Sequence, residues 1–408
     1  MTNRTAPSGA ARFGRVATAS ILTTLWLTGA AMAQEPVRIG IITDMSGPYS
    51  SLAGPGVVIG TRMAIEEFGG KVLGRPIEVL SADSGLKADI SVSRAREWYD
   101  QHAVQMIIEA SDSASAVALQ KLGESKKRIS FLHSGTTALT NADCSPYGIH
   151  YAFDTYSMAG GAARAAVKAG GKSWYFVTAD YVFGKSLEGD AAKIVKELGG
   201  TITGSVRHPL NAPDFASYLL SAQQSKAQVV ALANAGRDAQ NAVKQAAEFG
   251  LGRNQTIVPL LMFDTDIVGL GLKVAQGMEL ATAFYWDLDD RSRAFSKAFT
   301  AIHKSPPTMN HAGAYSATLQ YLKAVEAVGS LDPDRIMAHL RSVKLEDAFS
   351  RNGRVRVDGR MVHDIYHVRV KTPEKSTGPH DIFKVLATIE GDDAFMPLAD
   401  STCRLVKK

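Results

Sequence analysis

The sequence is poor in cysteine and tryptophan, and beyond residue 33 it has no long apolar run. The cysteines are two, Cys144 and Cys403, so one intramolecular disulfide at most can form. No later stretch reaches the roughly 20 apolar residues that span a bilayer. The formal net charge is +5, but the basic residues form no concentrated stripe, which argues against a nucleic-acid partner. A G-x-S-x-G nucleophile motif is absent too, so nothing local supports hydrolysis.

The first 33 residues predict a cleaved signal peptide. Arg4, Arg12 and Arg15 give a positive start, and an apolar run covers residues 16–30. Residues 31–33 (AMA) match the small-x-small cleavage pattern. The alternative, a membrane anchor, needs a longer run. Removing a segment with three arginines and no acid leaves a net charge near +2, in an exported chain.

Export makes a disulfide between Cys144 and Cys403 the expected state, because extracytoplasmic compartments are oxidising. The alternative is two free thiols. The bond would join the C-terminal tail to the first half of the chain.

Alternating strands and helices dominate the first two thirds of the sequence. Apolar strands are predicted at 37–43, 76–82, 104–110, 128–133, 173–179, 201–207, 228–234 and 257–263, with helices at 56–68, 87–101, 113–125, 156–169, 183–198, 213–224 and 237–249. Such a pattern indicates α/β architecture with buried parallel sheets and helices on both faces. Its restart near residue 156 predicts two doubly wound lobes.

The last third is less regular. Helices are predicted at 291–303, 309–328 and 334–342, with strands at 277–284, 361–370 and 382–389. The polar segment 372–380 is rich in Pro and Gly, and we expect a loop there.

Two motifs resemble binding sites, one for a dinucleotide and one for zinc, but we interpret both as structural. Gly54, Gly56 and Gly60, with Asp83 after the next strand, approximate a dinucleotide fingerprint. The spacing is wrong, however, and the turn does not follow the strand directly. His363 and His367 have a zinc-like spacing but lie in a strand-like segment, without other ligands nearby. We therefore predict neither a cofactor nor a metal.

Polar turns after neighbouring strands are more informative. Residues 111–115 (SDSAS) open a helix after the third strand, and residues 134–137 (SGTT) follow the fourth. Ligands of open parallel sheets bind beyond the carboxyl ends of the strands, where hydroxyls and free N–H groups can hold a carboxylate. Helix capping is the alternative role. The corresponding turns of the second repeat carry aromatic rings, which suit a small, partly apolar ligand.

Four segments make the chain resemble the periplasmic leucine/isoleucine/valine-binding protein family, the solute receptors of branched-chain-amino-acid-type ABC importers. They are RIGIITDMSGPYSSLAGPG, SDSAS, HSGTTALT and TADYVFGKS. The resemblance implies a type I periplasmic binding protein with three crossings between lobes, near Thr155, Phe284 and Asp358. It places lobe 1 at 36–155 plus 285–358, lobe 2 at 156–284 plus 359–395, and a tail at 396–408 packed on lobe 1.

The resemblance also implies the ligand-binding residues. In the family, a Ser at the position of Ser113 and a Thr at that of Thr136 hold the carboxylate, with backbone groups at Ser134 and Gly135. An aromatic residue stands where Phe183 is. The full predicted set is Tyr49, Ser113, Ser134, Gly135, Thr136, Tyr181, Phe183, Asn234, Phe263 and Asp264.

The implied function is capture of a small carboxylate in the periplasm, by a monomer that delivers it to the permease subunits of an ABC transporter. Amino-acid binders carry an acid for the ammonium group, and Asp264 could serve. The segments TADYVFG and AFYWDLDD look more like the branch that binds benzoate or hydroxybenzoate, which we favour. A branched-chain amino acid is the alternative ligand. An exported hydrolase with a dispersed active site, or a ligand-responsive regulator, is the alternative function.

Overall fold

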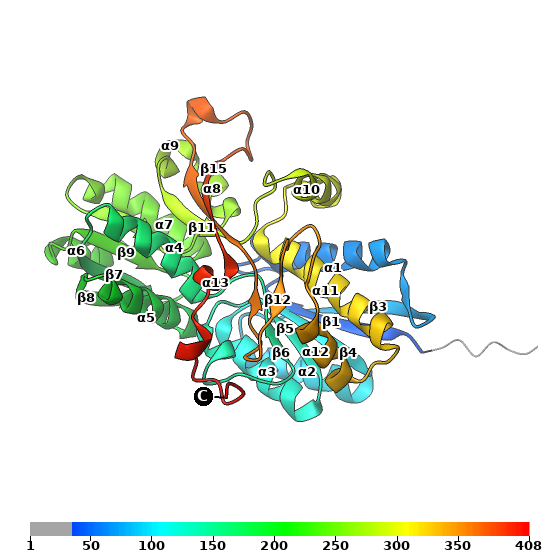
Figure 1. The fold of residues 1–408 in the computed structure, drawn as a ribbon. Coiled ribbons are helices and arrows are strands. Elements are labelled where there is room, and N and C mark those ends of the chain that lie inside the picture. Colours follow the sequence, from blue (N-terminus) through cyan, green and yellow to red (C-terminus); the bar gives the residue numbers. More distant parts are fainter. Residues whose placement is uncertain (1–34, 408) are drawn as a thin grey trace, which may run out of the picture. The chain divides into compact units, whose positions relative to one another are not determined.

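A computed structural model describes residues 35–407 and contains two parallel sheets, one from each strand–helix repeat (Figure 1). The predicted signal peptide lies outside the described residues. The first sheet has the order β2-β3-β1-β4-β5-β6, and the second the order β10-β9-β7-β8. In both, the chain begins at an inner strand, adds one neighbour on one side and then moves to the other side. This is the doubly wound arrangement that the sequence predicts.

The strands of the first sheet are parallel except for the short β2 hairpin with β3. Its elements are β1 (Val37–Thr43), α1 (Gly54–Phe68), β2 (Lys71–Val72), β3 (Arg75–Asp83), α2 (Ala88–Gln101), β4 (Val104–Ala110), α3 (Ser113–Lys126), β5 (Ile129–Leu132) and β6 (Gly148–His150).

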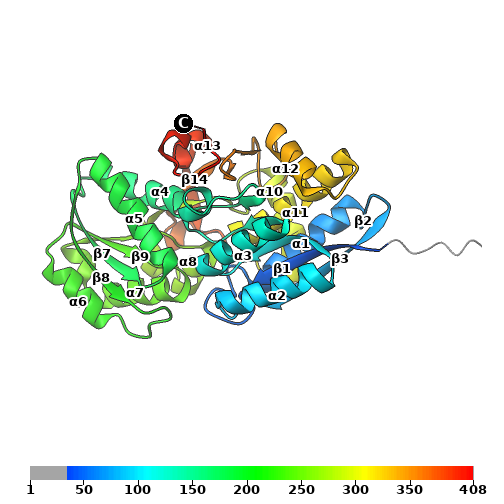
Figure 2. The same cartoon turned by 90° about the horizontal axis from the view of Figure 1, so that it is seen from below.

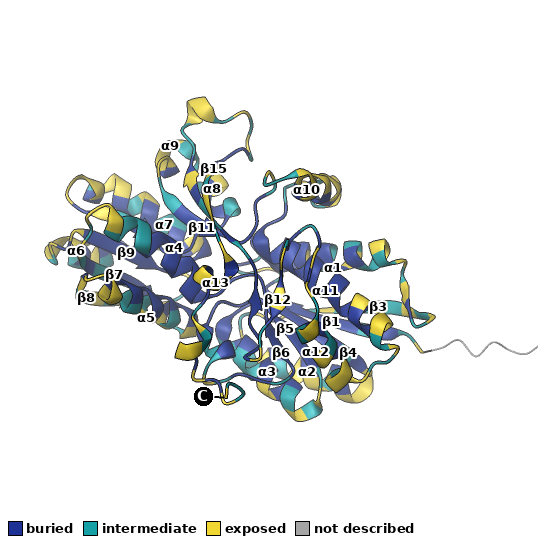
Figure 3. Cartoon of the chain, viewed as in Figure 1, coloured by how far each residue is buried: buried dark blue, intermediate teal, exposed yellow. Residues whose placement is uncertain are grey.

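Alternate residues of β1 supply two separate cores on the opposite faces of the first sheet. Ile39 and Ile41 belong to the core beneath α1, whereas Ile42 packs with Trp98 of α2. Successive side chains of a strand point to opposite faces, and each fully buried Ile contributes about 1.5–3 kcal/mol of transfer free energy. Figure 3 shows buried strands in both sheets between helices with exposed outer faces.

The second sheet repeats this plan with four parallel strands. Its elements are α4 (Thr155–Lys168), β7 (Ser173–Ala179), α5 (Val182–Glu197), β8 (Thr201–His208), α6 (Ala216–Gln224), β9 (Val229–Ala233), α7 (Gly236–Glu248), β10 (Thr256–Pro259) and α8 (Asp264–Leu270). Helices α4 to α7 surround this sheet in Figures 1 and 2.

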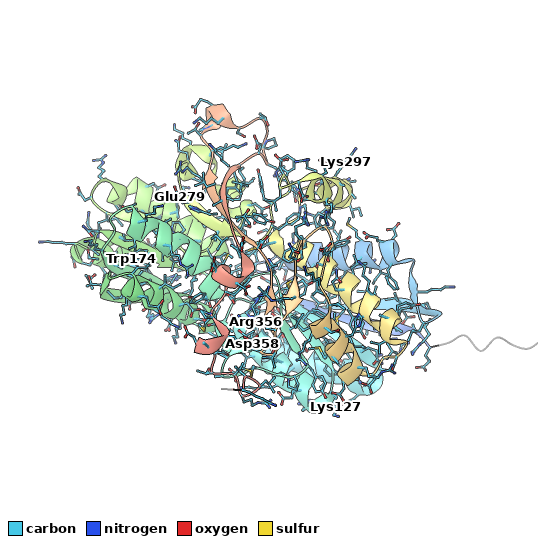
Figure 4. The ribbon with its side chains drawn as sticks, viewed as in Figure 1. Lys127, Trp174, Glu279, Lys297, Arg356 and Asp358 are labelled. Atoms are coloured by element: carbon cyan, nitrogen blue, oxygen red, sulfur yellow. A yellow bond between two sulfur atoms is a disulfide. The ribbon has the colours of Figure 1, made fainter. Side chains whose placement is uncertain are left out.

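The chain after α8 adds elements to both halves of the structure. It forms β11 (Glu279–Thr282), α10 (Asp290–His303), α11 (Met309–Val328), α12 (Pro333–Ser342), β12 (Arg354–Val355), β13 (Met361–Val362), β14 (Ile365–Val370) and β15 (Phe383–Ile389). Strands β11, β14 and β15 make a third, antiparallel sheet. In the segment around β12, Arg356 donates hydrogen bonds to Asp358, and Figure 4 labels the two side by side.

The continuous strand predicted at 361–370 is wrong. Residues 363 and 364 interrupt it, so that β13 pairs with β12 and β14 with β11 and β15. The interruption has a local cause, since the ring of His363 contacts two backbone carbonyls, those of Asp364 (2.8 Å) and Ala152 (2.5 Å). His367 instead faces Glu279, with 2.8 Å between Nε2 and Oε2. The two histidines therefore have separate, structural partners.

Helix α11 packs against α1, and the glycines of α1 explain the false dinucleotide motif. A Cβ at Gly56 would lie 2.3 Å from Nε2 of His311, and one at Gly60 would lie 2.5 Å from the carbonyl oxygen of His311. His311 Nε2 in turn contacts the carbonyl of Ala53 at 2.8 Å. The glycines thus permit close packing of two helices.

The C-terminal tail lies against the first half of the chain. A disulfide joins Cys144 to Cys403, as predicted, and Ser401 Oγ donates to the carbonyl of Thr140 at 3.1 Å. Among residues 35–407 no helix is long and apolar enough to cross a membrane.

Candidate functional site

A narrow cavity of about 40 Å³ lies between the carboxyl ends of the two parallel sheets. Most of its polar lining comes from the first sheet and α11, and its second-sheet lining is apolar or aromatic. The lining residues are Tyr49, Leu52, Ala110, Ser111, Asp112, Ser113, His133, Ser134, Gly135, Phe153 and Asn310 on one side, and Tyr181, Phe183, Ala235, Leu261 and Phe263 on the other. Mostly apolar and aromatic lining with a few polar groups is typical of sites for small organic molecules.

Ser113 opens helix α3 at the cavity wall. The cap of this helix is Asp112, whose carboxylate accepts hydrogen bonds from the N–H groups of Ala114 (2.9 Å) and Ser115 (3.0 Å). The Ser113 hydroxyl does not cap the helix and instead accepts a hydrogen bond from the N–H of Thr136 at 3.3 Å. This bond holds the two predicted polar turns together.

Thr136 was predicted to contact the ligand through its hydroxyl, but that side chain does not line the cavity. Its Oγ1 lies 3.2 Å from Oγ of Ser186, which belongs to α5. Nearby, Asp190 of the same helix accepts hydrogen bonds from Thr155 (2.6 Å) and Thr137 (3.1 Å). Burial raises the pKa of Asp190 to about 7. The threonine-rich turn therefore bonds to the second repeat beside the cavity.

Gly135 is a lining residue because only a glycine leaves room for the aromatic rings around it. A Cβ at this position would lie 2.9 Å from Phe183 and 3.0 Å from Phe153. Phe153 in turn makes an edge-on contact with Phe263, with ring centroids 5.8 Å apart. Both predicted phenylalanines, Phe183 and Phe263, thus lie in one aromatic wall.

Tyr49 and Tyr181 meet across the cavity through a hydrogen bond between their hydroxyls. Burial is the main cause that raises the pKa of each phenol above its usual value, so both remain neutral. The backbone at Gly236 adds to this contact, since a Cβ there would lie 3.1 Å from the Tyr49 ring.

Asn234 and Asp264 are not brought into the cavity lining. Asn234 is buried behind it, with Nδ2 at 3.1 Å from Nε2 of His208. Asp264 begins α8 and lines a different pocket, together with Trp286 and His380. The strand predicted at 257–263 ends at Pro259. Leu261 and Phe263 still line the cavity, and helix α8 begins at Asp264.

A buried carboxyl group lies behind the polar wall. Glu109 Oε1 accepts hydrogen bonds from the N–H of Ser111 (2.6 Å) and the hydroxyl of Ser134 (2.7 Å). Burial raises the pKa of Glu109 to about 7, against these bonds, which lower it. The side chain of Ser134 is therefore committed to Glu109, and its carbonyl oxygen lies 2.8 Å from Nε2 of His150.

Sequence reasoning missed three prominent lining residues: His133, Phe153 and Asn310. Phe153 follows β6, a strand that the pattern of apolar runs did not show. His133 stood in the predicted fourth strand, directly before the polar turn, and that position was its signal. Asn310 lies in the first turn of α11, 177 positions after His133 in the chain, where no local signal marks it.

The charge distribution limits what the cavity can hold. No Lys or Arg is among its lining residues, and Asp112 is the sole acid, its oxygens engaged by the first turn of α3. An anion there would be held by hydroxyl and N–H dipoles. Within residues 35–407, no group of three or more His, Cys, Asp or Glu side chains is placed to hold a metal ion.

Comparison with known proteins identifies the fold and the family. The periplasmic binding protein family matches residues 36–378. A periplasmic binding protein from Burkholderia mallei is 45% identical, with a TM-score of 0.90 over 91% of this chain and 100% of that one. A branched-chain amino acid ABC transporter periplasmic ligand-binding protein from Burkholderia xenovorans is 41% identical, with a TM-score of 0.82 over 90% and 99% of the two chains.

A more distant structure, at 22% identity, has the same fold. It is a solute-binding protein of an ABC transporter from Rhodopseudomonas palustris in complex with p-hydroxybenzoic acid, and its TM-score is 0.79 over 87% of this chain and 97% of that one. The resemblance predicted from the four sequence segments is thus confirmed. This chain belongs to the periplasmic binding protein family and is a solute-binding protein of an ABC transporter.

Proposed function

We propose that this protein captures an aromatic carboxylate, such as benzoate or a hydroxybenzoate, in the cavity between the sheets. Ser113, with the backbone at Ser134 and Gly135, would hold the carboxylate. Charge-assisted hydrogen bonds from hydroxyl and N–H groups are stronger than neutral ones. The rings of Phe183 and Phe263 would cover the apolar body.

The observation that carries this proposal is the absence of the predicted ammonium partner from the lining. Asp264 lines another pocket, and the second-sheet wall presents Tyr181, Phe183 and Phe263. An α-amino acid would bring a buried ammonium group without a free carboxylate to pair it, and an unpaired buried charge is costly. An aromatic acid carries no such group.

The lobes, crossings and tail predicted from the resemblance form part of the proposal. Lobe 1 would comprise 36–155 plus 285–358, and lobe 2 156–284 plus 359–395, with crossings near Thr155, Phe284 and Asp358. Binding would close the lobes by a hinge motion, because contacts such as Tyr49 with Tyr181 exist only when the lobes meet. The closed monomer would then deliver the ligand to the permease subunits. Export by the 1–33 signal peptide fits this role.

Thermal-shift and calorimetric titrations of the mature protein test the ligand. Benzoate and the hydroxybenzoates should raise the melting temperature once their concentration exceeds the dissociation constant, and leucine should not. Stabilisation by leucine alone would favour the second candidate, a branched-chain amino acid. That candidate is supported by the name of the Burkholderia xenovorans relative. Recovery of the acid unchanged, and no turnover of its esters, would separate binding from hydrolysis.

A further inference from the structure

Two polar side chains in the cavity wall have polar atoms without a hydrogen-bond partner. Neither side chain belongs to the residues predicted to bind the carboxylate. His133 is 1% exposed, and neither of its ring nitrogens has a hydrogen-bond partner. Asn310 is 3% exposed, and its Oδ1 has no partner. Both line the cavity. Buried polar atoms are nearly always hydrogen-bonded in folded proteins, so unpartnered ones that face a cavity point to a ligand group.

These side chains come from distant parts of the sequence but belong to one patch. A Cβ at Gly313 of α11 would lie 2.8 Å from Cε1 of His133, so the imidazole rests against that helix. Asn310 stands three residues before Gly313, on the same face of the helix. The ring of Tyr151 also packs near the imidazole, with 5.7 Å between the two ring centroids.

The charge state of the patch selects the ligand group. Burial, with the nearby Arg360, lowers the pKa of His133 to about 3, so the imidazole is neutral. A neutral imidazole offers one N–H donor and one acceptor, and the Asn310 carboxamide also offers both kinds. A hydroxyl group both donates and accepts, which matches the patch. It can accept from the imidazole N–H and donate to Oδ1 of Asn310, whereas a carboxylate cannot donate to that oxygen. An ammonium group could donate to it, but its buried charge would have no free carboxylate to balance it.

We propose that His133 and Asn310 form a subsite for a hydroxyl group on the ring of the ligand. The inference rests on the proposed function and narrows it from aromatic acids in general to hydroxylated ones. Leaving such a pair unsatisfied costs enough that an acid lacking the hydroxyl should bind about ten-fold more weakly, or worse.

The test is a calorimetric comparison of benzoate with the three monohydroxybenzoate isomers, using wild type, His133→Phe and Asn310→Leu. These substitutions keep side-chain bulk and remove the polar atoms. Asn241→Leu, at a half-buried position of α7 outside the cavity lining, is the matched control. We expect wild type to bind at least one isomer about ten-fold more tightly than benzoate, and each cavity variant to lose that preference while its benzoate affinity changes by less than about three-fold. The control should retain the preference.

The outcomes separate this inference from the proposed function. If wild type binds benzoate and all three isomers equally, or if the cavity variants weaken every acid to the same extent, the hydroxyl subsite is overturned while the aromatic-acid function stands. If wild type binds none of the four acids, the proposed function fails, and the subsite with it. Benzoate binding by each variant also shows that the variant has folded.

Discussion

Tyr49 and Tyr181 share a hydrogen bond between their phenol oxygens although 132 positions separate them in the chain. Tyr49 follows β1 of the first sheet and Tyr181 follows β7 of the second, so the bond joins the two sheets over the cavity. Both phenols are buried and neutral. The pair can form only when the two halves of the cavity wall are together.

Tyr181→Phe removes this bond and leaves the ring in place. A neutral hydrogen bond contributes about 0.5–1.5 kcal/mol, so we expect the ligand to bind about 2- to 10-fold more weakly. The loss should appear mainly as faster dissociation in stopped-flow measurements. Tyr218→Phe, on α6 away from the cavity, is the control and should leave dissociation unchanged. Equal dissociation rates in wild type and Tyr181→Phe would contradict a closing role for the pair.

Ser113→Ala and Thr136→Val should differ, although the family resemblance gives both residues the same task. The Ser113 hydroxyl lies in the cavity wall, and its loss removes a bond to a charged group, so affinity should fall about 10- to 100-fold. The Thr136 hydroxyl bonds Ser186 instead, so Thr136→Val should weaken binding only a few-fold. Thermal shifts at saturating ligand would rank the variants. A larger loss in Thr136→Val would show that this hydroxyl turns into the cavity when ligand is bound.

The free energy of unfolding should depend on pH through Glu109. Its pKa is about 7 in the folded protein and near 4.5 when unpaired in water, so between these values the folded state keeps a proton that the unfolded state releases. Stability is therefore fully present below about pH 4.5 and falls as pH rises to 7, by about 1.4 kcal/mol for each unit of pKa difference.

Urea denaturation at pH 5, 6, 7 and 8 measures this effect. Glu109→Gln should make the dependence shallower, without abolishing it, because burial raises the pKa values of Asp190, Asp264 and Asp266 in the same direction. Glu66→Gln, at an exposed position of α1, should reproduce the wild-type dependence. An unaltered slope in Glu109→Gln would mean that this carboxyl is ionised throughout the range.

The disulfide should stabilise the whole fold, since it closes a loop of 259 positions in sequence between Cys144 and Cys403. Replacing both cysteines with serine should lower the free energy of unfolding by about 2–5 kcal/mol. A reducing agent should cause a similar loss in wild type and none in the double variant. Ligand affinity should change little, because neither cysteine lines the cavity.

The alternation of strands and helices was readable from the sequence because the inner strands, such as β1, β4 and β9, are buried on both faces and therefore almost wholly apolar. The cavity edge followed from the same pattern, since parallel strands bring their carboxyl ends together. The direction in which each side chain points could not be predicted from this pattern. Thr136 and Ser113 stand in similar polar turns, yet one hydroxyl bonds across to α5 and the other lines the cavity.

The sequence also did not predict which distant segments supply residues to the cavity wall. Asn310 enters the wall because α11 returns to pack on α1, a contact fixed by glycines that looked like a nucleotide-binding motif. Asp264 was assigned to the site from the family resemblance, but α8 begins at this residue and its side chain lines another pocket. Local patterns locate the ends of elements, whereas packing decides which way their side chains face.

The cavity wall divides its chemistry between the sheets: nearly all polar groups lie on the first-sheet side, whereas the second-sheet side presents only apolar and aromatic side chains. A protein engineer can therefore treat the two sides as separate modules. Changes at Phe183 or Phe263 would alter the size of the ring that the cavity accepts without affecting the carboxylate-binding groups. Changes at Ser113 would alter the affinity for every acid to the same extent. A reporter dye placed near the Tyr49–Tyr181 junction would turn such variants into a set of fluorescent sensors for related acids.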